Sequence, residues 1–119
     1  MNLDDAIKAH GEWKLKLRRA IQDRQQLDAA SISRDNVCPF GQWLHGAAKT
    51  QYGRLRTYSA CVEKHAAFHR EAGRVAQTIN AGEYAVAEKM LDGGTPYAAA
   101  SSAIGGAILG LRKEVATTA

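Results

Sequence analysis

A regular apolar stripe along residues 50–80 is the feature that most limits how this chain can fold. Its members recur every three or four residues, which is the period of one face of an α-helix. They are Leu55, Tyr58, Val62, His65, His69, Ala72, Ala76 and Ile79. The stripe predicts one long helix from about Thr50 to Asn80, ended by Ala81-Gly82.

The rest of the chain has the same period and little that favours strands. It contains two prolines, Pro39 and Pro96, and no sustained alternation of β-branched residues. The other expected helices are Leu3–Leu27, a short one between Cys38-Pro39 and Gly46, Glu83–Leu91, and a last one from Thr95-Pro96 to about Val115, with a connection at 28–37. We therefore expect an all-α fold, an antiparallel up-and-down four-helix bundle with one extra short helix after Cys38.

Length and composition fit one ordinary domain. The chain has 119 residues, of which 45% are hydrophobic and 24% charged, so we expect a single domain over residues 1–119 with its core at about 3–115. No apolar run reaches the roughly 18 residues of a membrane span, and the first residues are acidic where a secretory signal is basic. We expect a cytoplasmic protein with reduced cysteines and no membrane partner. The basic residues behind the net charge of +4 are scattered, so nucleic acid is not an expected partner.

Three of the four histidines are placed where they could bind a metal ion. His65 and His69 are one helical turn apart, so both imidazoles project from the same face of the long helix. Two such ligands can hold one ion at about 2.0 to 2.1 Å. His10 lies on the inward face of the first helix, where an unpaired imidazole nitrogen costs roughly 1 to 3 kcal/mol. The alternative is that all three are hydrogen-bonded core residues.

Cys38 is the more informative of the two cysteines. Because it precedes Pro39, its backbone is kept out of the helical region, and Pro39 suits the first position of a helix. Cys38 is therefore an expected N-cap, and the positive end of the helix dipole should lower the pKa of its thiol. A thiolate both binds metals and reacts with oxidants. The alternative is a small buried residue in a turn.

Cys61 and His45 are set aside. Cys61 shares a face with His65 and His69, but eight residues of helix span about 12 Å, so one ion cannot easily bind both Cys61 and His69. Pairing His65 with His69 leaves Cys38 to supply sulfur, and we treat Cys61 as a small core residue. His45 precedes Gly46 at the end of the short helix, where it is expected to interact with free carbonyls.

Three motifs resemble the signatures of a known family. They are HGEWK from His10 to Lys14, CPFGQWL from Cys38 to Leu44, and HAAFH from His65 to His69. In this order, over about Leu3 to Leu111, they resemble the chemoreceptor zinc-binding domain. The resemblance implies a helical bundle in which the extra short helix carries the cysteine ligand, and one zinc ion bound by His10, Cys38, His65 and His69.

The resemblance also implies a function. Members are bacterial cytosolic sensory modules, often dimeric, attached to a chemoreceptor or a diguanylate cyclase. We therefore expect a homodimer that controls chemotaxis or cyclic-di-GMP signalling, with Cys38 sensing an oxidant such as hypochlorous acid, or with zinc level as the signal. Because the sequence has no cyclase signature and no long heptad-repeating helix, we expect either an excised or stand-alone copy, or an output partner on another chain.

Residues beside the ligands are expected to shield the site. Trp13, Phe40, Trp43 and Phe68 should wall it from solvent, or serve as ordinary core, and Gly41 should allow a close helix contact or mark a turn. Four protein ligands fill a tetrahedral zinc site, so we do not expect an enzyme.

Two other classes of function stay open on the residues alone. One is a metal-dependent or thiol-based enzyme, with an open position on three histidines and Cys38 as nucleophile. The other is a structural helical interaction module whose histidines are core residues and which contains no metal.

Overall fold

The computed structural model describes residues 1–118, which are helical with short connections and contain no strand. The helices are α1 (Leu3–Gly11), α2 (Trp13–Asp23), α3 (Ala29–Ile32), α4 (Pro39–His45), α5 (Ala47–Tyr52), α6 (Arg56–Asn80), α7 (Tyr84–Met90) and α8 (Pro96–Thr118). The expected all-α class is confirmed.

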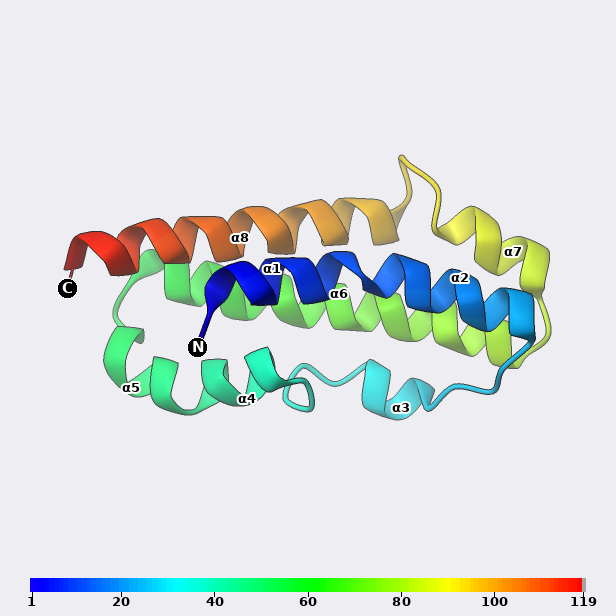
Figure 1. Cartoon of the computed structure of the whole chain (residues 1–119), viewed down its shortest axis with the longest axis horizontal. Helices are drawn as coiled ribbons and strands as arrows, with labels where there is room; N and C mark the ends of the chain where they lie inside the picture. The colour runs from blue at the N-terminus through cyan, green and yellow to red at the C-terminus, as the bar shows by residue number, and fades with distance from the viewer. Residues whose placement is uncertain (119) are drawn as a thin grey trace.

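The chain runs along the molecule and back, and then along and back again (Figure 1). Helices α1 and α2 form the first pass, and the row α3, α4 and α5 returns beneath them. Helix α6 forms the next pass, and α7 and α8 return above it. Helix α6 packs against α8, α3, α7 and α2, and α8 also packs against α1. The return by α3 to α5 is a broken row, so the strict four-helix bundle stays a prediction.

The first expected helix, Leu3–Leu27, is shorter than predicted and is interrupted. At Glu12 the backbone has φ −73° and ψ −15°, and its N–H still bonds Lys8, so α1 and α2 are nearly continuous. The break follows Gly11, a residue that weakens helix interiors. Helix α2 ends at Asp23 because Arg24 takes the left-handed conformation, with φ 51° and ψ 45°.

The long helix begins six residues later than the stripe predicted. Leu55 is extended, with φ −79° and ψ 141°, and α6 starts at Arg56. Before it lies the separate helix α5, which ends at Tyr52 with Gly53 as its C-cap. The stretch expected to be a connection contains α3, capped by the Asp28 side chain. The stripe itself faces the core as predicted, and most of its residues are buried.

The core places polar side chains among apolar ones. Around α6 it contains Leu17, Phe40, Phe68, Ile104 and Ile108, all nearly inaccessible to solvent. The buried polar residues in the described part of the chain are His10, His65 and His69. Among the helices the structure describes, none is both long and apolar enough to cross a bilayer.

Candidate metal centre

The structure contains a compact cluster of four possible metal ligands. Three are histidine nitrogens, one from each of three residues, and the fourth is a cysteine sulfur. The residues are His10, Cys38, His65 and His69, and their possible ligand atoms all lie within 4.8 Å of one another. They come from α1, from the residue before α4, and from α6. The four residues singled out by the sequence are therefore the ones that the fold brings together.

His65 and His69 form the deep side of the group. Their spacing on α6 points both rings the same way, and their Nε2 atoms are 3.0 Å apart. His65 is 0% exposed and His69 is 2% exposed. Both rings therefore sit where only a proton, a metal ion or a packed neighbour can reach their nitrogens.

Cys38 supplies the sulfur from the N-terminus of α4. Its backbone is extended, at φ −70° and ψ 156°, Pro39 follows in the first turn, and Sγ accepts a hydrogen bond from the Gly41 N–H at 3.3 Å. The expected N-cap is confirmed. From there Sγ lies 3.3 Å from Nε2 of His65 and 3.6 Å from Nε2 of His69.

These separations fit the edges of a small tetrahedron. With zinc bonds of about 2.05 Å to nitrogen and about 2.3 Å to sulfur, tetrahedral angles place nitrogens about 3.3 Å apart and sulfur about 3.6 Å from nitrogen. The Nε2 atoms of His65 and His69 and the Sγ of Cys38 lie within about 0.3 Å of those values. These three donor atoms already have the spacing of a zinc site, and the donor atom of His10 lies within 4.8 Å of each of them.

Backbone carbonyls orient two of the imidazoles. Nδ1 of His10 donates to the carbonyl oxygen of Ala6 at 2.7 Å, and Nδ1 of His69 donates to that of Ile32 at 2.9 Å. Because a carbonyl only accepts, each Nδ1 carries the hydrogen and each Nε2 is left with a lone pair facing the group. Sequence spacing could have suggested Ala6, which lies one turn before His10. Ile32 is distant in sequence and carried no such signal.

The Nε2 of His10 is a direct test of whether a cation belongs here. It is buried and has no hydrogen-bond partner among the described residues. An orphaned buried acceptor costs roughly 1 to 3 kcal/mol, and a metal ion between the four donors would remove that cost. The residues present therefore fit a bound cation. Nδ1 of His65 is also buried without a partner in the described chain, so the polar contacts of this ring are at Nε2, with Cys38 and His69.

Burial keeps the imidazoles in their metal-binding form. It lowers the pKa of His10 and His69, and it lowers the pKa of His65 to about 2, with further lowering by the neighbouring His69 and His10. Neutral imidazole is the form that coordinates metals. At neutral pH all three rings are ready to bind.

The expectation that the pKa of Cys38 is lowered is wrong for the chain alone. Burial raises the pKa of its thiol, and this outweighs the lowering by the backbone N–H groups at the start of α4. The free-energy cost of desolvating the thiolate exceeds the stabilisation that the N-terminus of a short helix provides. A positive charge at the site, rather than the helix, would be needed to hold the thiolate.

Aromatic rings surround the group. Phe40 lies edge-on to His65 at 5.1 Å between ring centroids, Phe68 lies 5.5 Å from His10, and Trp13 lies 6.4 Å from His69. The ring contacts of Trp43 are with Phe40 and Tyr52, so Trp43 stands behind Phe40.

Gly41 lies close to both Asp35 and His65. A Cβ there would overlap the backbone carbonyl of Asp35 and would come within 3.1 Å of Cε1 of His65. The residue therefore permits the close contact that the sequence suggested. Neither a turn nor a positive φ requires it.

The two residues set aside lie outside the group. Cys61 is fully buried in the core, and burial raises the pKa of its thiol to about 12. Nε2 of His45 lies 2.9 Å from the Asp35 carboxylate, so the carbonyl interaction expected for His45 is replaced by this partner. Asp35 was not singled out from the sequence, although its backbone touches the position of Gly41.

Comparisons with known proteins support the same conclusion. The model of the chemoreceptor zinc-binding domain family matches residues 10–76, which include all four candidate ligands. No curated protein and no solved structure matches the chain. Domains of this family are sensory modules that bind zinc, and the His3Cys group here is placed to hold one such ion. The chain belongs to the chemoreceptor zinc-binding domain family.

Proposed function

We propose that the chain senses oxidants or zinc level through one zinc ion bound by His10, Cys38, His65 and His69. The observation that carries the proposal is the convergence of three neutral imidazoles and one sulfur within 4.8 Å. Four such donors complete a tetrahedral site and leave no position for a water or a substrate. The donor set therefore favours sensing over hydrolysis.

The ligands tie separate parts of the fold together. His10 belongs to α1, Cys38 stands at the start of α4, and His65 and His69 belong to α6. When bound, zinc supplies the positive charge that keeps the sulfur of Cys38 as a thiolate. Cys38 is then the link that holds α4 against α6, because its Sγ is also the cap of α4.

Oxidation of Cys38 would break that link. A thiolate attacks the oxygen of hypochlorous acid, so that a sulfur–oxygen bond forms, the oxygen–chlorine bond breaks, and the products are a sulfenic acid and chloride. Sulfur is oxidised and chlorine is reduced, with no further reactant. A sulfenic acid is a poor zinc ligand, so α4 is released from α6. Loss of zinc by depletion would release it in the same way.

The change at α4 is passed to a partner. We assign the chain to a bacterial cytoplasmic homodimer that controls chemotaxis or cyclic-di-GMP signalling through a chemoreceptor or a diguanylate cyclase. We also infer that residues 1–119 act as one domain built as an up-and-down four-helix bundle. In support, α8 packs against α1 and α6 although it lies beyond the segment matched by the family model.

The surroundings of the site have a part in this proposal. Phe40 and Phe68 pack against the imidazoles, and Trp43 packs against Phe40. Trp13 lies beside the imidazole of His69. We assign them, with Gly41, to a wall that limits the access of water to the site. Reduced access of water strengthens the attraction between the ion and the thiolate.

Elemental analysis of the protein purified without added metal tests the proposal. We expect one zinc per chain, and loss of stoichiometric zinc in Cys38→Ala but not in the matched control Cys61→Ala. One equivalent of hypochlorous acid should release the zinc and consume one titratable thiol. Zinc retained by Cys38→Ala at the affinity of the unaltered chain would contradict the proposed ligand set. A second experiment uses a mild chelator to hold free zinc at a cellular level, with no oxidant present. If the protein loses its zinc under that condition, the signal is the zinc level.

A further inference from the structure

Two hollows in the surface of the molecule are both lined in part by Cys38. The larger, here called the α1 hollow, has a volume of about 440 Å³, and its lining includes Ala9, Trp13, Pro39 and Phe40 together with His10 and Cys38 of the site. The smaller, the α3 hollow, has a volume of about 210 Å³, and its lining includes Trp13, Ile32 and Val37 together with Cys38 and His69.

Trp13 and Cys38 are the two residues that line both hollows. The indole of Trp13 therefore stands between the two approaches to the sulfur. Nζ of Lys16 lies 5.0 Å from the centre of the Trp13 ring and helps to hold the indole in place. His65 lines neither hollow and is 0% exposed. Among the four candidate ligands, Cys38 is the one that lines both hollows.

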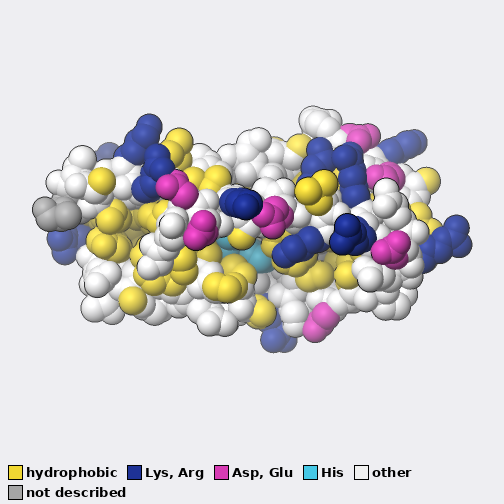
Figure 2. Space-filling model, in the orientation of Figure 1, with side chains coloured by type: hydrophobic (Ala, Val, Ile, Leu, Met, Phe, Trp, Pro, Cys, Tyr) yellow, Lys and Arg dark blue, Asp and Glu magenta, His cyan; other side chains and the backbone are white. Residues whose placement is uncertain are grey.

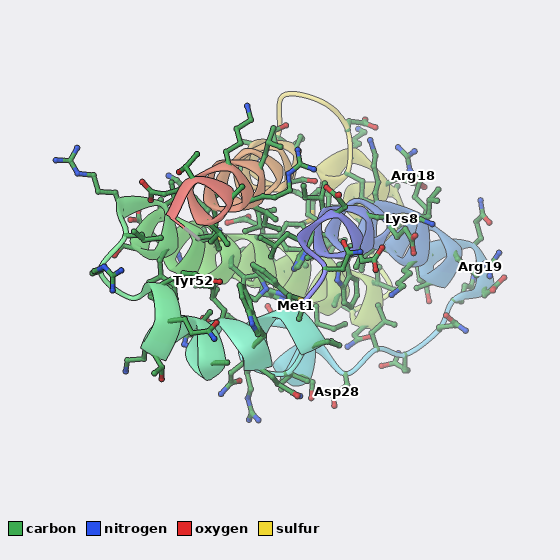
Figure 3. All side chains as sticks on the ribbon, turned by 60° about the vertical axis from the view of Figure 1, so that its left-hand side comes forward. Met1, Lys8, Arg18, Arg19, Asp28 and Tyr52 are labelled. Carbon is green, nitrogen blue, oxygen red and sulfur yellow. The ribbon has the colours of Figure 1, made fainter. Side chains whose placement is uncertain are left out.

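The α1 hollow is mostly apolar. Its charged side chains, Asp5 and Lys16, are both exposed. Figure 2 shows a histidine near the middle of this face with both hydrophobic and charged side chains beside it, and Figure 3 shows Met1, another lining residue, between α1 and the short helices. An ion that enters such a hollow loses part of its hydration against the apolar lining, whereas an uncharged molecule has little hydration to lose.

We propose that the α1 hollow is the entry path by which small uncharged molecules reach the sulfur of Cys38, and that Trp13 sets which molecules pass. The proposal concerns the site of the proposed function. It adds that the reagents are small and uncharged, and that they reach Cys38 through the α1 hollow. It is tested on the metal-free chain, so that its outcome does not depend on zinc binding or on signalling.

The probes are three methanethiosulfonates of similar length: uncharged butyl, anionic sulfonatoethyl and cationic trimethylammonioethyl. The thiolate of Cys38 attacks the sulfenyl sulfur, so that a protein–sulfur disulfide bond forms, the thiosulfonate S–S bond breaks, and methanesulfinate leaves with the electron pair. The rate of each reagent with the protein is divided by its rate with free N-acetylcysteine, which removes differences in intrinsic reactivity. Peptide mass analysis shows whether the modified residue is Cys38 or Cys61. Because all three reagents meet the same fraction of thiolate, ratios of their rates report access alone.

Exclusion of charge predicts that both charged reagents react slowly. We expect each to be at least about tenfold slower than the butyl reagent, equivalent to about 1.4 kcal/mol in the barrier. If nearby charges attracted or repelled the reagents, the rate would rise for one charged reagent and fall for the other. In Trp13→Ala we expect the difference to fall below about threefold, since water can then follow the reagent to the sulfur.

Variants at exposed positions decide between the two routes. Ala9→Phe fills the α1 hollow and should slow the butyl reagent about tenfold, whereas Val37→Trp narrows the α3 hollow and should slow it less than about twofold. The matched control is Ala99→Phe, the same change at an exposed helical position on α8, which should have no effect. These variants test the route even where Trp13→Ala does not fold.

Three results would overturn the proposal. They are equal relative rates for charged and uncharged reagents in the unaltered chain, an unchanged butyl rate in Ala9→Phe, and a slowing by Val37→Trp as large as that by Ala9→Phe.

Discussion

The Sγ of Cys38 lies 3.3 Å from the Nε2 of His65, and this contact joins the N-cap of the short helix α4 to the most deeply buried histidine of the long helix α6. That contact links chemistry at a reachable sulfur to packing at the centre of α6. His65 has no hydrogen-bond partner at Nδ1 among the described residues, so its ring position depends on its neighbours. Predictions about stability and about the site are therefore connected.

Zinc should stabilise the fold because its ligands come from three separate segments. A ligand that binds only the folded state adds about 2.7 kcal/mol at a concentration of one hundred times its dissociation constant. We expect zinc to raise the melting temperature of chelator-treated protein, measured by circular dichroism, and to do so far less in His10→Ala. The matched control is His45→Ala, because His45 bonds Asp35 outside the group. An equal zinc shift in both variants would contradict a role for His10.

Gly41→Ala should destabilise the chain and weaken zinc binding. The added methyl would overlap the backbone carbonyl of Asp35 and press on His65. Overpacking of this kind costs about 1 to 3 kcal/mol, which urea unfolding would measure. Gly105→Ala is the control, because nothing lies within 4 Å of a Cβ at that position of α8. It should be neutral or stabilising by up to about 1 kcal/mol, since alanine favours helix. Similar losses in both variants would disprove the contact.

Acid should destabilise the metal-free protein in a defined range. Burial lowers the pKa of His10, His65 and His69 in the folded chain, whereas in the unfolded chain each imidazole titrates near pH 6.5. Below that pH the unfolded state binds more protons, so the free energy of unfolding falls as pH falls.

The slope should reach up to about 4 kcal/mol per pH unit for three protons. Urea unfolding of chelator-treated protein at pH 7.5 and pH 5.5 would measure it. His45→Ala should show the same loss, and a free energy of unfolding that is level across this range would contradict buried neutral imidazoles.

Asn80→Ala should destabilise the far end of the molecule without changing the zinc site. The Asn80 side chain accepts from the N–H of Leu27 and donates to its carbonyl oxygen, both at 2.8 Å. Its loss leaves two part-buried backbone groups unpaired, at about 1 to 3 kcal/mol each before water compensates. Asn80→Asp keeps the acceptor and should lose less stability. Reduced zinc affinity in either variant would show that the two ends are coupled.

Local sequence determined the features that depend on neighbouring residues. The period of residues 50–80 predicted the buried face of α6, and the Cys38-Pro39 pair predicted the start of α4. The one-turn spacing of His65 and His69 placed their rings together. Helix geometry alone fixes these relationships, so they can be predicted without knowing what packs where.

Tertiary packing decided the rest. The raised pKa of Cys38 follows from burial, which no local pattern reports and which outweighed the helix end. The acceptor for His69 is Ile32, on a helix that the sequence indicated only as a connection, and the breaks at Glu12 and before Arg56 depend on how neighbouring segments fit. Spacing in the sequence specified which atoms could bind a metal. Only the convergence of three distant segments decided that they meet, because that depends on the packing of the whole core.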